Sequence, residues 1–280
     1  MTYPLETIDP AAATPLRIAM VQMRVVGGDV PGNLARAVQG IARAAELGAH
    51  IAVLPECLDL GWTFPEARSL AEPVPDGTPC AALAAAARTH GVVVCAGVTE
   101  RDGDAVYNTA VLLDGDGSLL LRHRKINELA IAHAVYDHGD RLGVARTELG
   151  TLGVLVCADA VARGGATLET LALMGADVIL SPSAWAVPPE HDNAADPYGT
   201  LWRDAYTEVA REHGCAVVGT SNVGRVAGGA WDGWGCIGCS LAVDTDGTEV
   251  LQAPYGVDAE GVHVVEIHPR SRTVRGSGWR

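Results

Sequence analysis

Lysine is almost absent from this chain of 280 residues, and no block rich in lysine and arginine occurs in it. Thirty-four acidic residues against twenty basic ones give a net charge of −14 at pH 7. A nucleic-acid-binding surface needs clustered positive charge, so the composition argues against that class of partner. The acidic surplus mainly predicts solubility. A lysine inside a patterned segment is therefore a candidate for a specific role.

Long apolar runs are also missing, since no stretch approaches the roughly 18 residues that cross a bilayer. We expect no membrane association. Residues 1–14 carry acids and prolines where a signal peptide has basic and then apolar residues. We therefore expect a flexible arm there and a cytoplasmic protein.

The seven cysteines are odd in number and scattered, which argues against a disulfide framework. Cys236 and Cys239 form a C-x-x-C pair. A second ligand pair at workable spacing is missing, and residues three apart in one strand face opposite ways. We expect these two cysteines to pack in the core and bind no metal.

No linker rich in proline, glycine or serine divides the chain, and no repeat is visible, which predicts a single domain over residues 15–280. Apolar runs typical of strands alternate with helical patterns, and hairpins such as the one around residues 114–117 lie between them. This pattern predicts an α/β fold with mixed sheets covered by helices. One expected helix begins with Asn33 as its N-cap and ends at Gly48.

Three of the expected strands end on a residue with useful chemistry. These residues are Glu56, Lys125 and Cys157, after the apolar runs 50–54, 119–121 and 152–156. If the three strands are neighbours, a carboxylate, an ammonium and a thiol meet at one edge of a sheet. Glu128 follows Lys125 by three residues and can fold back to the same place.

Such a set has definite chemical roles. A cysteine is a nucleophile only as the thiolate, which a nearby base or cation favours. Glu56 is a candidate general base and then general acid. Lys125 and the backbone N–H of Ala158 are candidates for stabilising an oxyanion, and Glu128 would hold the lysine. Each residue also has a plain structural reading, as a core thiol or a solvated strand end.

The segments VLPE (53–56), RHRK (122–125) and GVLVCAD (153–159) resemble the Glu, Lys and Cys signatures of the nitrilase superfamily of carbon–nitrogen hydrolases. Later segments, GADVILSPSAW, SNVG and GCSLAVDTDGTEV, extend the likeness over roughly residues 16–268. The resemblance implies a four-layer α-β-β-α sandwich with two mixed sheets packed face to face. It also implies cleavage of a non-peptide C–N bond through a cysteine thioester, without metal or organic cofactor. Glu56, Lys125 and Cys157 match the base, the stabiliser and the nucleophile, and Glu128 matches a second glutamate.

Departures from these signatures bear on the substrate. Nitrile-hydrolysing members typically have Trp-Glu after the cysteine, whereas Ala158 and Asp159 follow here, which resembles the amidase and carbamoylase branches. Ile126 and Asn127 follow the lysine, where many amidases carry His-Leu. Three residues near the expected strand ends are candidate substrate contacts: Trp62, Trp185 and Arg163.

These features predict an amidohydrolase that acts on a small amide or an N-carbamoyl compound and forms a homodimer or a larger homo-oligomer. The alternatives are an N-acyltransferase using the same thioester, a nitrile-hydrolysing enzyme and a catalytically silent binding protein. No histidine is an obvious partner of Cys157, which argues against a papain-like enzyme. We expect Asp159 to bind backbone N–H groups beside the nucleophile, and His123 to support Lys125.

Overall fold

The computed structural model describes residues 15–270, and the arm expected at residues 1–14 lies outside them. Two six-stranded sheets form the centre of the molecule. The first has the order β16-β1-β3-β4-β5-β6 and consists of β1 (Leu16–Gln22), β3 (Ile51–Val53), β4 (Val93–Asp102), β5 (Ala105–Leu113), β6 (Leu119–Arg124) and β16 (Gly261–Ile267). The second has the order β15-β14-β11-β9-β8-β7 and consists of β7 (Val144–Thr147), β8 (Gly150–Val154), β9 (Val178–Ser183), β11 (Ala216–Ser221), β14 (Leu241–Val243) and β15 (Glu249–Gln252).

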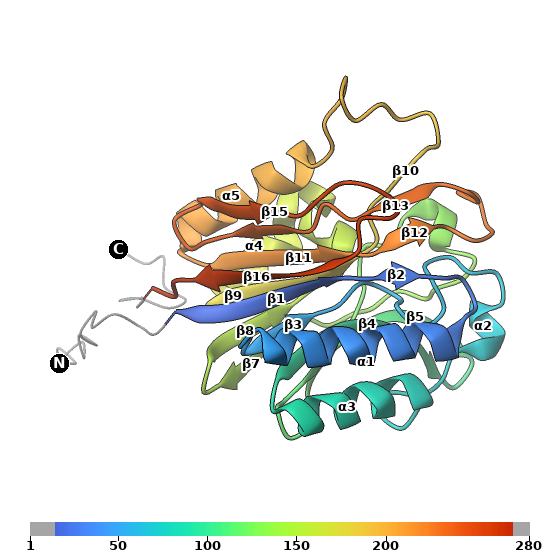
Figure 1. The fold of residues 1–280 in the computed structure, drawn as a ribbon, viewed down its shortest axis with the longest axis horizontal. Helices are drawn as coiled ribbons and strands as arrows, with labels where there is room; N and C mark the ends of the chain where they lie inside the picture. The colour runs from blue at the N-terminus through green and yellow to red at the C-terminus, as the bar shows by residue number, and fades with distance from the viewer. Residues whose placement is uncertain (1–14, 271–280) are drawn as a thin grey trace.

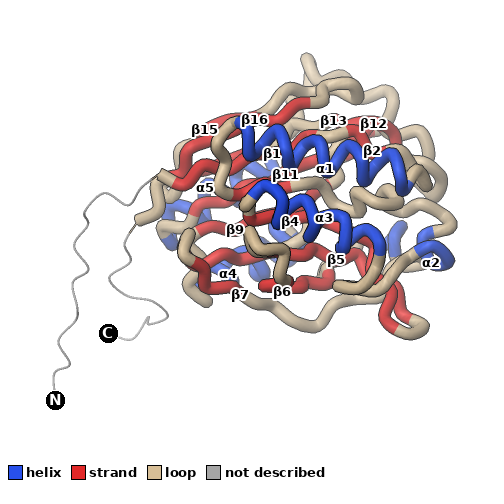
Figure 2. Tube along the Cα trace, turned by 60° about the horizontal axis from the view of Figure 1, so that its bottom comes forward, coloured by secondary structure: helices blue, strands red, loops and turns tan. Residues whose placement is uncertain are grey.

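Two pairs of helices cover the outer faces of these sheets (Figure 1). Helices α1 (Val30–Glu46) and α3 (Thr78–His90) pack side by side on the first sheet and lie in front of its strands in Figure 2. Helices α4 (Ala166–Leu173) and α5 (Thr200–His213) cover the second sheet. A short helix, α2 (Ala67–Leu70), lies in the connection before α3. The predicted four-layer α-β-β-α sandwich with two mixed sheets is confirmed.

The alternation of side chains along β1 shows how the layers are held together. Ile18 and Met20 point into the apolar core between the two sheets, whereas Ala19 and Val21 point toward the helices. Because successive side chains of a strand face opposite ways, a strand buried on both faces reads as one apolar run. Full burial of a side chain such as isoleucine contributes about 1.5–3 kcal/mol. This core fixes the position of one sheet against the other.

The start of α1 differs from the prediction. Asp29 is the N-cap, and its carboxylate accepts a 3.1 Å hydrogen bond from the backbone N–H of Gly32. Pro31 suits the first turn, where no intrahelical partner for an N–H exists. Asn33 lies inside the helix, is fully buried, and donates to the backbone oxygen of Asp59 at 2.8 Å. Its side chain ties α1 to the loop after β3, so it does not cap the helix.

A third, four-stranded sheet was not predicted. It has the order β10-β13-β12-β2 and consists of β2 (Arg24–Val25), β10 (Ala186–Val187), β12 (Val223–Arg225) and β13 (Gly235–Ile237). Strands of two or three residues are too short to show an alternation in sequence. The C-x-x-C pair does not lie in one strand as expected, because β13 ends at Ile237 and Cys239 has a φ of +58°. Both cysteines are buried, and among residues 15–270 no cluster of side chains suited to a metal ion occurs.

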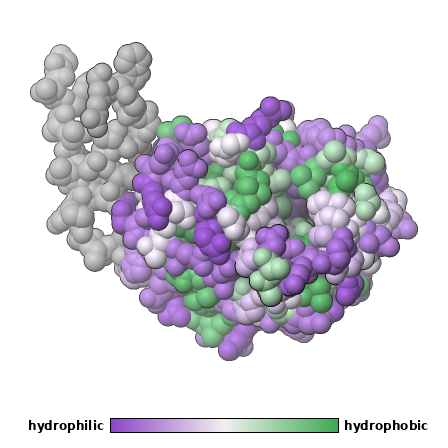
Figure 3. All heavy atoms as spheres, turned by 90° about the horizontal axis from the view of Figure 1, so that it is seen from above, coloured by the Kyte–Doolittle hydropathy of each residue, from purple (hydrophilic) through white to green (hydrophobic). Residues whose placement is uncertain are grey.

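One face of the molecule shows how polar and apolar side chains are distributed on the surface. Seen from above, hydrophilic side chains cover much of the molecule, with hydrophobic patches between them (Figure 3). Within the described part of the chain, no helix has both the length and the apolar character that a membrane span requires.

Candidate active site

Glu56 lies in a tight turn after β3 that is held from both sheets. Gly97 of β4 donates its N–H to the oxygen of Pro55 and accepts from the N–H of Leu58, both at 2.9 Å. A Cβ on Gly97 would lie 2.5 Å from the Cα of Glu56, so only glycine allows this close approach. The N–H of Glu56 itself donates to the oxygen of Ser183 on β9, at 3.2 Å. The turn therefore bridges the two sheets.

Lys125 reaches this turn from the end of β6. Its Nζ donates to Oε1 of Glu56 at 2.7 Å, and each of the two side chains is 1% exposed. Burial lowers the pKa of Lys125, but the charges of Glu128 and Glu56 outweigh it and hold the pKa above its ordinary value. Lys125 is therefore a cation at neutral pH. It is also the only lysine of the 280 residues.

Asn108 of β5 supports both partners and was not among the site residues predicted from the sequence. Its Nδ2 donates to Oε1 of Glu56 at 2.6 Å, and its backbone oxygen accepts from the N–H of Lys125 at 2.8 Å. The side chain is 1% exposed. A polar residue inside an otherwise buried strand was the available indication, because a buried amide needs a partner.

Glu128 is the third charged side chain beside Glu56 and Lys125, and its contact with Lys125 is longer than that of Glu56. Its Oε2 lies 3.4 Å from Nζ of Lys125, and neither carboxylate oxygen makes a well-aligned hydrogen bond to the described residues. Burial and the charge of Glu56 raise its pKa, while Lys125 opposes them. Glu128 thus gains a proton more readily than an exposed glutamate. The structure brings it to Lys125, as its spacing predicted.

Cys157 begins a 3₁₀ turn, Cys157–Ala160, just past β8, and has a φ of +45°. Its thiol interacts with the Glu56 carboxylate, with the ammonium of Lys125 and with the backbone N–H of Ala184. Burial and then the Glu56 charge raise its pKa far above the ordinary value, while Lys125 and Ala184 lower it. The resting side chain is therefore the neutral thiol. We call Glu56, Lys125, Glu128 and Cys157 the ionisable cluster.

The sequence suggested that the cluster would form if its three strands were neighbours in one sheet, but they are not neighbours. Strands β3 and β6 lie in the first sheet with β4 and β5 between them, whereas β8 belongs to the second. The residues meet because the sheets stack face to face and the turns after their strands converge. Periodicity reports which face of a strand is buried and carries no information on which sheet it joins.

Asp159 links the two sides of the cluster. Its carboxylate accepts hydrogen bonds from the backbone N–H groups of Ile126 and Asn127, at 3.2 and 2.8 Å, and from that of Val156 at 3.3 Å. His123 bonds this carboxylate at 2.8 Å, and its support of Lys125 stays a prediction. Burial raises the pKa of Asp159, but His123 and the other partners lower it below its ordinary value. The ionised carboxylate fixes the segment after Lys125 against the Cys157 turn.

The three candidate substrate contacts lie in different environments. The ring of Trp62 has its centroid 5.7 Å from Nζ of Lys125, so it borders the cluster. Trp185 is 2% exposed and stacks on Trp202 in the core between β9 and α5, with ring centroids 4.9 Å apart. Arg163 is exposed and has a φ of +52°. Their contact with substrate, and that of the Ala158 N–H with an oxyanion, stay predictions.

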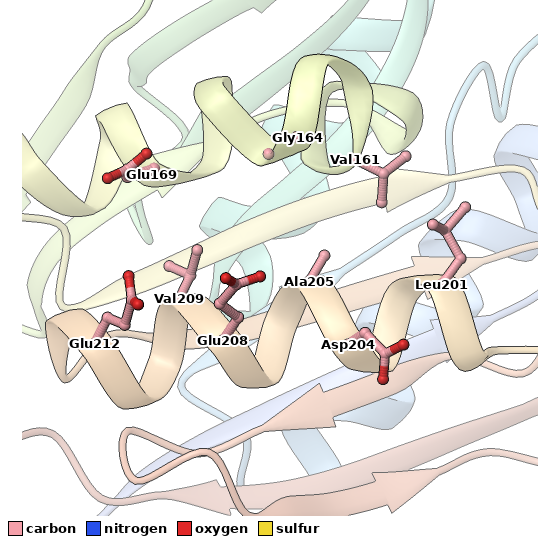
Figure 4. Close-up of a pocket in the computed structure, with 10 residues that line it drawn as sticks. Val161, Gly164, Glu169, Leu201, Asp204, Ala205, Glu208, Val209 and Glu212 are labelled. Carbon is pink, nitrogen blue, oxygen red and sulfur yellow. The ribbon is translucent and has the colours of Figure 1, made fainter.

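A separate groove lies between α4 and α5, with a volume of about 260 Å³. Glu208 and Glu212 of α5 point toward the segment that carries Glu169, and Val161 lies at the other end (Figure 4). No member of the ionisable cluster lines this groove.

Comparison with known proteins gives consistent results. The sequence profile described as "Carbon-nitrogen hydrolase" matches residues 17–275. A nitrilase of Pyrococcus abyssi is 34% identical over 215 residues, which cover 74% of this chain and 80% of that protein. An (R)-stereoselective amidase of a Pseudomonas species is 30% identical over 253 residues, covering 90% of this chain and 85% of that protein. Among solved structures, a cysteine-to-alanine mutant of the Nesterenkonia AN1 amidase from the nitrilase superfamily superposes with a TM-score of 0.77, at 23% identity and 90% coverage of both chains.

Proposed function

From the premise that this chain belongs to the carbon–nitrogen hydrolase family, we propose that it hydrolyses a small amide or an N-carbamoyl compound through a thioester on Cys157. One observation carries the proposal: a buried carboxylate, Glu56, contacts both the only lysine and the thiol of Cys157. Burying a charged pair beside a thiol costs free energy of folding. Buried ionisable groups with shifted pKa values of this kind are typical of active sites.

The first half of the reaction begins with the neutral thiol. Glu56 takes the thiol proton as the sulfur attacks the carbonyl carbon of the amide, and the new C–S bond makes the carbonyl oxygen an oxyanion. Lys125 and the N–H of Ala158 stabilise that oxyanion. Glu56 then gives its proton to the leaving nitrogen, the C–N bond breaks, and ammonia or an amine departs.

The second half repeats these steps with water. Glu56 removes a proton from a water molecule, whose oxygen attacks the thioester carbon. The C–S bond breaks, the acid leaves, and the proton on Glu56 returns to the thiolate of Cys157. Because burial and the charge of Glu56 raise the pKa of Cys157, proton transfer to Glu56 must accompany attack. Lys125 stays protonated throughout.

The experiment is ammonia release from a panel of small amides, N-carbamoyl compounds and nitriles. We expect turnover of at least one amide or N-carbamoyl compound, and a fall of ~10²–10⁴ in kcat for Glu56→Gln because the proton shuttle is removed. Asp102→Asn is the matched control, since this acid is exposed and pairs with Arg124 outside the cluster. A near-normal rate for Glu56→Gln would reject the mechanism.

Nitrile hydrolysis is the second candidate, favoured by the 34% identity to the Pyrococcus abyssi nitrilase. The same thiol can add to a nitrile carbon. Ala158 in place of the tryptophan typical of nitrile-hydrolysing members supports the amide. A higher kcat/KM for nitriles than for the matching amides in the same panel decides for the nitrile. Added hydroxylamine separates acyl transfer from hydrolysis, because a transferase forms the hydroxamate in preference to the acid.

We also propose a cytoplasmic homodimer that uses the face formed by α4 and α5. Three large apolar side chains of this face are strongly exposed: Leu173, Met174 and Leu201. Exposed apolar groups beside a groove are typical of an association surface. Sedimentation should give twice the mass of one chain, and Leu201→Arg should shift it to the monomer. A wild-type monomer at micromolar concentration would contradict the proposal.

A further inference from the structure

A small cavity lies between the loop after β3 and the third sheet. Trp62 lines it from the loop side, and Asn222 and Cys236 line it from the side of β12 and β13. Its volume is about 10 Å³, which is close to the minimum that one water-sized group requires. The cavity therefore suits a single polar atom with its hydrogen.

Two of its walls carry a buried polar atom with no hydrogen-bond partner among residues 15–270. These atoms are Nε1 of Trp62, a donor, and Oδ1 of Asn222, an acceptor. The two residues are only 6% and 5% exposed. Buried polar groups are nearly always paired, because an unpaired one loses its bonds to water without replacement. One donor and one acceptor beside the same cavity point to one ligand group that satisfies both.

The amide nitrogen of Asn222 donates a hydrogen bond to the thiol of Cys236, and this bond sets the orientation of the amide. Burial raises the pKa of that thiol to about 12, and the hydrogen bond from Asn222 opposes the shift. The remaining amide atom, Oδ1, is then the acceptor available to a ligand.

The cavity borders the ionisable cluster. The Trp62 ring that forms one wall lies 5.7 Å from Nζ of Lys125. On the opposite wall, the Cys236 thiol is close enough to Glu56 to sense its charge. The cavity therefore lies beside two members of the ionisable cluster, Lys125 and Glu56.

We propose that the cavity is a subsite for a hydroxyl group on the acyl part of the substrate, which accepts from Trp62 Nε1 and donates to Asn222 Oδ1. This inference rests on the proposed hydrolysis. A hydroxyl is the water-sized group that both accepts and donates. A carboxylate has no proton for Oδ1, an ammonium has no lone pair for Nε1–H, and a methyl group has neither.

The test uses pairs of amides that differ only by hydroxyl against methyl: 3-hydroxypropanamide with butanamide, and 4-hydroxybutanamide with pentanamide. For the wild-type protein we expect kcat/KM to favour the hydroxyl member by about 10–100-fold at one chain length. Trp62→Phe keeps the aromatic ring but removes the donor, so this preference should fall by about tenfold. Trp202→Phe is the matched control, since Trp202 is also buried but its Nε1 donates to the hydroxyl of Tyr198 and its side chain does not line the cavity. It should leave the preference unchanged.

Calorimetric binding of the same amides to the Cys157→Ala variant separates the subsite from the chemistry. Preferential binding of the hydroxyl member supports the subsite even if the wild-type protein turns over no amide, a result that would reject only the proposed function. Equal kcat/KM for both members of each pair, or an unchanged preference in Trp62→Phe, overturns the subsite. A stronger preference for succinamate than for either hydroxyl amide also overturns it, because the cavity then binds a carboxylate.

Discussion

The turn after β3 and the turn after β8 have the same local pattern. Each begins just past a buried parallel strand, places a cysteine at a φ of +45°, and has a buried aspartate two residues later. The pairs are Cys57 with Asp59 and Cys157 with Asp159. In the first turn the cysteine is fully buried and bonds the hydroxyl of Tyr136 at 3.5 Å. In the second the thiol bonds the Glu56 carboxylate, and the charge of Lys125 acts on it.

The aspartates differ in the same way. Among the side chains of residues 15–270, only that of Thr99 bonds Asp59, and burial raises the pKa of Asp59 to about 6. Asp159 accepts from several N–H groups and from His123, which keep its pKa low. Two turns of one shape therefore acquire opposite electrostatics from their neighbours. The backbone turn sets where the cysteine lies. The charged groups that face its thiol then decide its pKa and its reactivity.

Replacing each of the two cysteines by alanine, in separate variants, is the strongest test of this comparison. Cys157→Ala should lower kcat by about 10⁴-fold or more, because the C–S bond cannot form. Cys57→Ala should stay within about tenfold of wild type, since its thiol is fully buried and bonds the hydroxyl of Tyr136. Thermal unfolding of both variants should remain cooperative. Turnover surviving in Cys157→Ala would reject the assignment of the nucleophile.

The pH dependence of stability distinguishes the aspartates. The pKa of Asp59 is about 6 in the folded state and 3.8 in the unfolded state. The stability that the protonated Asp59 contributes is therefore fully present below about pH 4 and is lost as the pH rises through 6. Relative to wild type, Asp59→Asn should therefore gain about 3 kcal/mol of unfolding free energy between pH 3.5 and pH 7. Urea unfolding at several pH values measures this difference. A difference that does not change with pH would show that Asp59 has an ordinary pKa.

Asp159→Asn should have the smallest effect of the three, a fall of about 10–100-fold in kcat with KM nearly unchanged. Asparagine has one acceptor oxygen, so it cannot hold Ile126, Asn127 and Val156 together. Asp59→Asn is the matched control and should keep kcat, because the hydrogen bonds described for the Asp59 carboxylate go to Thr99 and not to the segment after Lys125. A fall in stability without a fall in kcat would make Asp159 purely structural.

The alternation of apolar runs and helical patterns predicted mixed sheets covered by helices, and the family resemblance implied the four-layer sandwich. The strand ends at Glu56, Lys125 and Cys157 could be predicted because each follows an apolar run. The sequence did not predict that the cluster forms between two stacked sheets, since pairing partners depend on long-range packing. Gly97 and Asn108 were missed for a related reason: their roles appear only when the turn after β3 lies against β4 and β5. The N-cap was misplaced because Asn33 and Asp29 are both good capping residues, and Pro31 decides between them.

The position of Lys125 has a practical consequence. As the chain has no other lysine and this one is 1% exposed, the folded protein presents no side-chain amine to solvent. Acetylating reagents and amine-directed cross-linkers will therefore find no lysine to modify on its surface. Acetylation at this one position would report directly that the sandwich had opened.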